Sequence, residues 1–475
     1  MVCRMAELPG GSALFRSVEV APGHEGDCRV RGGRIVALAP RLRAAPGENV
    51  VDGGGGALLP GLADHHLHLT AMAAQAASVD LSGRTAATLG RTIRSATPGP
   101  DGWIRATGYD DGAHGPLDRE ILDTWADGRP VRVQHRSGAL WVVNSAGLQR
   151  LGADSAAAPP GVERDGSGRA TGRLWRVDGW LGERIGARPP SLTAIGARLA
   201  AFGITHVTDA TPDSAAVPVL AGALHRGELP QYVTSLAAHR PAPVSHPRLR
   251  LGARKLVVAD HELPELAALV REISVSHAAR RPVAVHCVTP AALALTLAAL
   301  DEAGHHARDR IEHCALADTA AVRELAAHRL RVITQPTFIA RRGDAYLERT
   351  PTAEHADLWR YGSLLRAGVT TAPGSDAPYG DPDPWACLRA ARDRTTPSGR
   401  VLAPGERTSP ARVLRGMLSR PCDPGGPPRR LTTGARADLV LLHVPLDEAL
   451  RHLDSALVRA TYVGGRAVYG PVPPR

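Results

Sequence analysis

Apolar runs of strand length alternate with helical patterns through the middle of the chain. Residues 263–280 and 290–304 place Leu and Ala at helical spacing, and short apolar runs lie between such stretches. This alternation predicts an α/β fold with parallel strands joined by crossover helices. The nine strand candidates are residues 57–66, 130–137, 203–211, 231–239, 254–260, 281–289, 310–317, 330–338 and 368–378.

A closed (β/α)8 barrel needs eight strands, one fewer than these candidates provide. We interpret residues 231–239 (QYVTSLAAH) as the extra or edge strand. The remaining pattern predicts a TIM-like barrel over residues 57–405. The long stretch from about residue 78 to 186 is rich in Gly and Asp, and we interpret it as an insertion over the barrel mouth, where loops contact substrate.

Both ends of the chain show short alternating strands separated by glycine turns. Residues 14–40 have this pattern, as do residues 437–446 and 456–470. Two strand-rich ends around an α/β middle predict that the ends meet in one small domain. We therefore expect a composite β-sandwich built from residues 1–56 and 406–475.

Charge and composition narrow the classes of function. The net charge is +10, yet the arginines are scattered among 47 acidic residues and aromatic residues make up only 4%. Neither a basic patch nor stacking platforms for nucleic acid are indicated. The six cysteines form no CxxC pair, and no apolar run reaches the 18 residues of a membrane span. We expect free thiols, no membrane partner and a cytoplasmic location.

One residue stands out against the arginine bias. Of the 57 basic residues, Lys255 is the single lysine. An ammonium group can lose its proton and become a neutral nucleophile, whereas a guanidinium stays charged. The two open interpretations are a surface lysine that survived by chance and a position that needs an amine.

Metal-competent side chains follow five of the apolar strands. Since the C-terminal ends of parallel barrel strands converge on one mouth, four imidazoles and a carboxylate would meet there. Such a set suits zinc or a similar divalent ion. The imidazoles are those of His66, His68, His286 and His313, the carboxylate is that of Asp376, and the remaining strand contributes Lys255 as a sixth candidate ligand.

These motifs resemble those of the amidohydrolase superfamily. LLPGLADHHLHL is similar to its first-strand motif, and RKLVVAD, VHC, EHC and GSDAP match its later Lys, His, His and Asp in order. GYDDGAHGPLDREILD, VVNSAGLQRLG and GSGRATGRLWR resemble the insertion of the amidohydrolase family 3 branch, which includes N-substituted formamide deformylases. The resemblance covers nearly the whole chain.

The resemblance implies a metal-dependent enzyme that hydrolyses non-peptide C–N bonds of small molecules, such as N-acyl or N-formyl amines. It implies a carbamate on Lys255, formed from the neutral amine and carbon dioxide, that bridges two metals. His66, His68 and Asp376 would hold one ion, and His286 and His313 the second. Asp376 would also carry the proton from the attacking water to the leaving amine. Zinc is the expected ion, at one or two per chain, and a homodimer is the expected assembly.

The match to the branch is incomplete where substrate would be recognised. His286 is followed by Cys287-Val288-Thr289, where Gly-Asp-Arg is usual in the family. The substrate of the deformylases therefore cannot be assigned to this chain from the resemblance. The branch's insertion loop matches at Tyr109 and Asp110, and His135 ends a strand candidate, so these three are candidate substrate contacts. Alternation along a strand points Cys287 and Cys314 away from the mouth, as core residues.

Two other functions stay open at this level. A non-catalytic binding protein could use the same fold, although it should have lost at least one ligand and this chain keeps all six. A barrel metalloenzyme of another class, an isomerase or a phosphoester hydrolase, could use the same cluster on a different electrophile.

Overall fold

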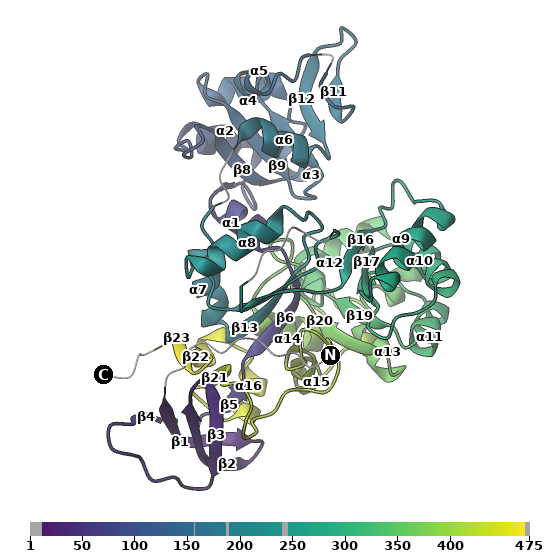
Figure 1. The fold of residues 1–475 in the computed structure, drawn as a ribbon. Coiled ribbons are helices and arrows are strands. Elements are labelled where there is room, and N and C mark those ends of the chain that lie inside the picture. Colours follow the sequence, from purple (N-terminus) through teal and green to yellow (C-terminus); the bar gives the residue numbers. More distant parts are fainter. Residues whose placement is uncertain (1–11, 156, 187–189, 240–245, 471–475) are drawn as a thin grey trace. The chain divides into compact units, whose positions relative to one another are not determined.

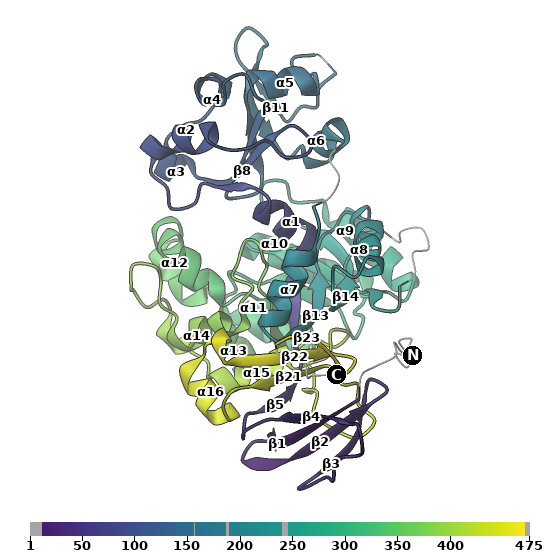
Figure 2. The same ribbon diagram turned by 90° about the vertical axis from the view of Figure 1, so that its left-hand side faces the viewer.

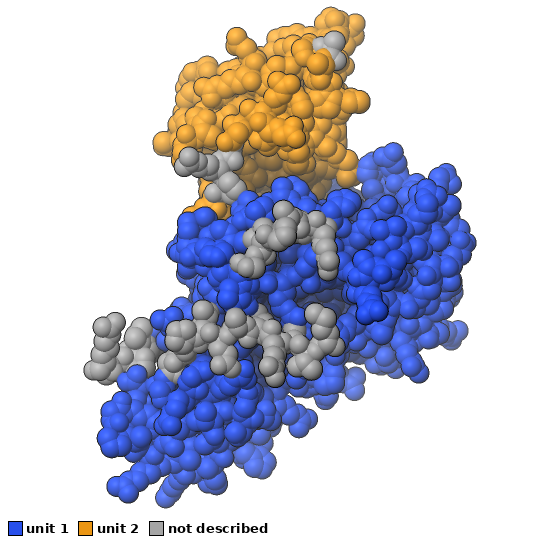
Figure 3. All heavy atoms as spheres, in the orientation of Figure 1, with its two compact units in different colours: residues 1–69, 192–475 blue, residues 70–191 orange. Residues whose placement is uncertain are grey.

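A computed structural model describes residues 12–155, 157–186, 190–239 and 246–470. The chain divides into two compact units, residues 1–69 with 192–475 (unit 1) and residues 70–191 (unit 2), which Figure 3 distinguishes by colour. Among the described residues, no helix is both long and apolar enough to cross a bilayer. All described cysteines are free thiols, and Cys3 lies outside the described residues.

Unit 1 contains two parallel sheets (Figure 1). The first has the order β15-β14-β13-β6 and the second β16-β17-β18-β19-β20. The first comprises β6 (Leu62–Leu67), β13 (Ile204–Asp209), β14 (Tyr232–Ser235) and β15 (Leu249–Leu251). The second comprises β16 (Arg254–Val257), β17 (Val283–Cys287), β18 (Arg310–His313), β19 (Arg331–Thr334) and β20 (Thr370–Pro373).

Two pairs of strand ends connect these sheets through the backbone. Asp376 N–H, after β20, donates to the carbonyl of His66 at 2.7 Å, and His68 N–H donates to the carbonyl of Ala377 at 2.8 Å. On the other side, Lys255 N–H donates to the carbonyl of Leu236 at 2.8 Å. The two sheets therefore meet along both β6–β20 and β14–β16.

The interpretation of the extra strand is wrong. Residues 231–239 contain β14, which pairs with β13 in the parallel sheet. Instead, β9 (Val131–His135), from the candidate at 130–137, belongs to unit 2. It lies between β8 (Ile104–Tyr109) and the antiparallel β10 (Leu140–Val143), a partnership that its own alternating pattern does not reveal.

Helices cover the outer face of the second parallel sheet. Val283, Val285 and Ile311 belong to one hydrophobic cluster with residues of the helices that follow the strands. Cys287 and Cys314 lie in the same cluster, so both are core residues as expected. The helices of unit 1 are α7 (Thr193–Ala201), α8 (Ala216–His225), α9 (Leu266–Ala278), α10 (Pro290–Ala303), α11 (Thr319–Ala327), α12 (Thr337–Arg349), α13 (Tyr361–Arg366), α14 (Pro384–Asp393), α15 (Pro410–Met417) and α16 (Leu446–His452).

Two further sheets of unit 1 come from the ends of the chain (Figure 2). One hydrophobic cluster contains Phe15 and Val18 from the first strand together with Leu439 and Tyr462 from the last strands. The rings of Phe15 and Tyr462 meet edge to face at 5.0 Å between centroids. The strands are β1 (Ala13–Ala21), β2 (His24–Arg31), β3 (Arg34–Ala39), β4 (Asn49–Asp52), β5 (Leu58–Pro60), β21 (Leu439–Leu442), β22 (Val458–Val463) and β23 (Arg466–Tyr469).

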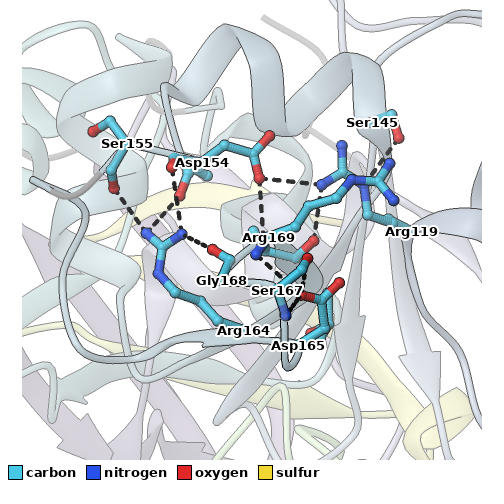
Figure 4. Close-up of polar contacts among 12 residues, drawn as sticks. Arg119, Ser145, Asp154, Ser155, Arg164, Asp165, Ser167, Gly168 and Arg169 are labelled. Carbon is cyan, nitrogen blue, oxygen red and sulfur yellow. Dashed lines mark hydrogen bonds and ion pairs between the residues drawn. The ribbon is translucent and has the colours of Figure 1, made fainter.

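Unit 2 is built on a six-stranded mixed sheet of order β11-β12-β10-β9-β8-β7. In the hairpin of β11 and β12, Arg164 donates to the carbonyls of Ser155 at 2.7 Å and Gly168 at 2.8 Å, and the buried Arg119 pairs with Asp154 at 3.2 Å (Figure 4). Its other elements are β7 (Val79–Asp80), β11 (Val162–Arg164), β12 (Ala170–Trp175), α1 (Leu69–Ala76), α2 (Ala86–Arg94), α3 (Asp111–His114), α4 (Arg119–Ala126), α5 (Ser145–Leu151) and α6 (Asp178–Ile185).

Candidate metal centre

Five of the six predicted ligands lie near or just beyond the C-terminal ends of parallel strands of unit 1, and the sixth, Lys255, is the second residue of β16. Lys255 and His286 lie on β16 and β17, on the face opposite the hydrophobic cluster that carries Val283 and Val285. His313 and Asp376 have φ angles of 70° and 52°, a left-handed conformation uncommon for residues with a Cβ. The extended backbone is therefore interrupted at His313, the last residue of β18, and at Asp376, three residues after β20.

Asp376 lies among three imidazoles. Its Oδ1 is 3.4 Å from His66 Nε2 and 3.2 Å from His68 Nε2. Its Oδ2 is 4.0 Å from His313 Nδ1. One ligand atom from each of His66, His68 and Asp376 lies within 4.8 Å of the others, so these three could hold one metal ion.

His286 and Lys255 complete the cluster. The rings of His286 and His313 lie 4.4 Å apart between centroids, and those of His66 and His313 lie 4.8 Å apart. Lys255 is 3% exposed, and burial lowers the pKa of its amine. The buried Lys255 Nζ and His66 Nε2 have no hydrogen-bond partner in the part of the chain that the structure describes. Buried polar atoms are normally satisfied, so these two point to a group that a metal centre would supply.

A buried ion pair fixes the orientation of His66. Glu312 is fully buried, accepts a hydrogen bond from His66 Nδ1 and pairs with Arg310. Burial opposes its ionisation, but Arg310 and His66 hold the pKa of Glu312 well below its ordinary value. Because Nδ1 is engaged by the carboxylate, Nε2 is left to face Asp376. Such an outer partner fixes the tautomer of a metal-binding histidine.

The other imidazoles have weaker partners of the same kind. His313 Nδ1 lies 3.0 Å from Gln335 Oε1, and His68 Nδ1 lies 3.3 Å from Thr211 Oγ1. Asp64 accepts from the backbone N–H of His66 at 3.0 Å and of Ser375 at 3.1 Å. This one carboxylate holds together the two segments that carry His66 and Asp376.

Sequence reasoning missed Glu312 and Arg310. Both charged residues flank Ile311 in RIEH, and alternation puts them on one face of a strand whose other face is apolar. Two opposite charges on one face of an otherwise apolar strand are the sequence feature that could have indicated this buried ion pair.

We expect Glu312→Gln to weaken metal binding by about 10–100-fold, the usual cost of losing an outer-shell partner of a metal ligand. It should also lower the free energy of unfolding by about 3–5 kcal/mol, because Arg310 keeps a buried charge without its counter-ion. Metal dialysis and thermal denaturation measure the two effects. The exposed Glu302→Gln is the control, and unchanged metal affinity in Glu312→Gln would contradict the role assigned here.

The three candidate substrate contacts belong to unit 2, whereas all six predicted ligands belong to unit 1. Tyr109 is fully buried in the core of that unit, and its hydroxyl donates to Asp111 at 2.7 Å. Asp110 pairs with Arg136 at 3.1 Å. His135 Nε2 lies 3.5 Å from Asp111, whose side chain is 43% exposed. Asp111, which the sequence did not single out, is therefore more accessible than Asp110, whose side chain is 20% exposed. The hydrogen bond from the buried Tyr109 hydroxyl holds the Asp111 carboxylate in place.

Comparison with known proteins gives consistent matches along the chain. The sequence model of the amidohydrolase family matches residues 49–469. An N-substituted formamide deformylase of Arthrobacter pascens is 25% identical, over 97% of this chain and 98% of its own length.

Solved structures share the fold. A metal-dependent hydrolase of Pyrococcus horikoshii superposes with a TM-score of 0.73 at 18% identity, over 91% of this chain and 97% of that one. N-isopropylammelide isopropylaminohydrolase of Burkholderia multivorans gives 0.52 at 17% identity, over 96% and 98%. The chain belongs to the amidohydrolase family and is a metal-dependent hydrolase acting on non-peptide carbon–nitrogen bonds of small molecules.

Proposed function

We propose that the protein hydrolyses the amide bond of a small N-acyl or N-formyl amine. The observation that carries this proposal is the convergence of Asp376 with His66, His68 and His313 at the strand ends. The formamide deformylase relative supports the substrate class. A cytoplasmic location and a homodimer stay predictions from the sequence.

We propose further that the two parallel sheets form one (β/α)8 barrel. Removing the short β15 leaves eight strands, and the backbone bonds of β6 to β20 and of β14 to β16 support closure. The hydrophobic cluster shared by β1 and β22 supports a composite β-sandwich from residues 1–56 and 406–475. Residues 57–405 would then be the barrel, with 78–186 as its insertion. Before the last strands, α15 lies against β6, where the carbonyl of Gly416 contacts His65 Nε2 at 3.0 Å.

In the proposed centre, His66, His68 and Asp376 would hold one zinc ion, and His286 and His313 would hold a second. Lys255 would supply a carbamate as a further ligand, and the lowered pKa of its buried amine favours formation of that carbamate. When bound, the metal provides a Lewis acid for the carbonyl and lowers the pKa of water.

The residues of the chain then direct the protons. Asp376 accepts the proton of the attacking water as the water oxygen bonds to the carbonyl carbon. It returns that proton to the nitrogen as the C–N bond breaks, which releases acid and amine. Glu312 keeps His66 in one tautomer throughout, and Asp64 keeps the His66 and Ser375 segments in register.

Metal content per chain and a substrate panel test the proposal. We expect about two equivalents by elemental mass spectrometry on enzyme purified without chelators in bicarbonate buffer, and turnover of N-acyl or N-formyl amines that chelation abolishes. Turnover of phosphoesters alone, or isomerisation without release of an amine, would overturn the substrate class. Retention of full activity after complete metal removal would overturn the mechanism.

A further inference from the structure

A second cluster of metal-competent side chains lies outside the centre described above. Asp301 is near the end of α10, His305 follows that helix, and His328 directly follows α11. One ligand atom from each lies within 4.8 Å of the others. We propose that Asp301, His305 and His328 form a peripheral binding site for zinc or a similar divalent transition-metal ion.

The geometry of the three side chains supports this assignment. His305 Nε2 lies 3.0 Å from Asp301 Oδ1, and His328 Nε2 lies 3.4 Å from the same oxygen. The two rings stack at 4.5 Å between centroids with an angle of 16° between planes. Both Nε2 atoms therefore face the same carboxylate oxygen, and the stacked rings bring two imidazole nitrogens close to it.

These side chains are accessible to an ion from solvent. The Asp301 side chain is 53% exposed, that of His305 27% and that of His328 30%. Two imidazoles and one carboxylate are a donor set that zinc accepts, with water able to complete its coordination.

The cluster lies at the opposite ends of the strands from the metal centre. His305 belongs to the connection from α10 to the start of β18, and His328 to the connection from α11 to the start of β19. His313 and Asp376 are at or beyond the C-terminal ends of β18 and β20. A bound ion would therefore link two helix–strand connections and stabilise the fold without touching the substrate.

A neighbouring histidine pair provides a matched control. His306 packs against His277 with 5.8 Å between ring centroids, and His277 Nε2 contacts Asp309 at 3.0 Å. His306 is in the same connection as His305, but it is not part of the cluster. His306→Ala therefore removes one imidazole from the same segment and leaves the proposed site intact.

The test compares zinc binding by the metal-loaded enzyme, His305→Ala/His328→Ala and His306→Ala. At equal buffered free zinc, we expect the wild type and His306→Ala to hold one more zinc per chain than the double variant, by elemental mass spectrometry. Added zinc should raise the thermal midpoint of the first two and not of the double variant, because only a native site binds. Hydrolytic activity should be the same in all three.

Two results would overturn the site. Equal zinc in the wild type and the double variant shows that the cluster binds none. Loss of the extra zinc in His306→Ala as well shows diffuse binding by surface histidines. Because the comparison is a difference between variants, it does not depend on how many ions the catalytic centre holds.

Discussion

Lys255→Arg is expected to abolish hydrolysis. The loss of activity should exceed the decrease of about 100-fold that follows removal of an outer-shell partner of a metal ligand. The guanidinium cannot become a neutral amine, so no carbamate forms. It also leaves a permanent charge at a position where the side chain is only 3% exposed and where burial already lowers the pKa of the lysine amine. Metal content should fall together with activity.

A second substitution separates lost chemistry from lost folding. Lys255→Ala removes the amine and leaves space, so formate or acetate added to the buffer could supply the missing carboxylate. We expect these anions to restore part of the activity and metal content of Lys255→Ala and none of Lys255→Arg. Near-UV circular dichroism checks that both variants are folded. Full metal content and activity in Lys255→Arg would refute the carbamate.

Asp376→Asn is expected to reduce kcat by about 10²–10⁴-fold, the usual contribution of a positioned acid–base group. The amide keeps the size of the side chain and one oxygen ligand, but it cannot accept a proton. The loss should therefore appear in kcat more than in metal content. Steady-state kinetics and metal analysis on the same preparation measure both.

Asp381→Asn is the matched control for this experiment. It removes a carboxylate from the same segment, and Asp381 contacts the backbone N–H of Asp383 and not the histidines. Its kcat should be unchanged. Nearly normal kcat in Asp376→Asn would show that another group carries the proton.

The positions of the proposed ligands could be picked out from the sequence because all of them except Lys255 lie near or after the end of an apolar strand. Periodicity fixes which face a residue takes, and parallel strands bring their ends together, so His286 and Lys255 needed no tertiary information. Glu312 was harder to predict, because its partner His66 lies on a strand far away in the sequence. The same limit explains β9 and β14, whose patterns are alike while their pairing partners belong to different units.

The positive φ angles of His313 and Asp376 also could not be predicted from the alternation of apolar and polar residues. Strict alternation would put Glu312 and His313 on opposite faces, yet both belong to the centre. The positive φ of His313 reorients its side chain after the strand ends. Tertiary contacts, not local propensity, hold such a conformation.

The edge-to-face pair of Phe15 and Tyr462 has a consequence for the synthesis of the protein. Ribosomes add about 5–20 residues per second, so on the order of a minute separates the appearance of these two rings. Throughout that time Phe15 and Val18 have no Leu439 or Tyr462 to pack against, although these four share one cluster in the finished protein. The earliest apolar strands are therefore exposed to chaperones and to aggregation until the last strands leave the ribosome.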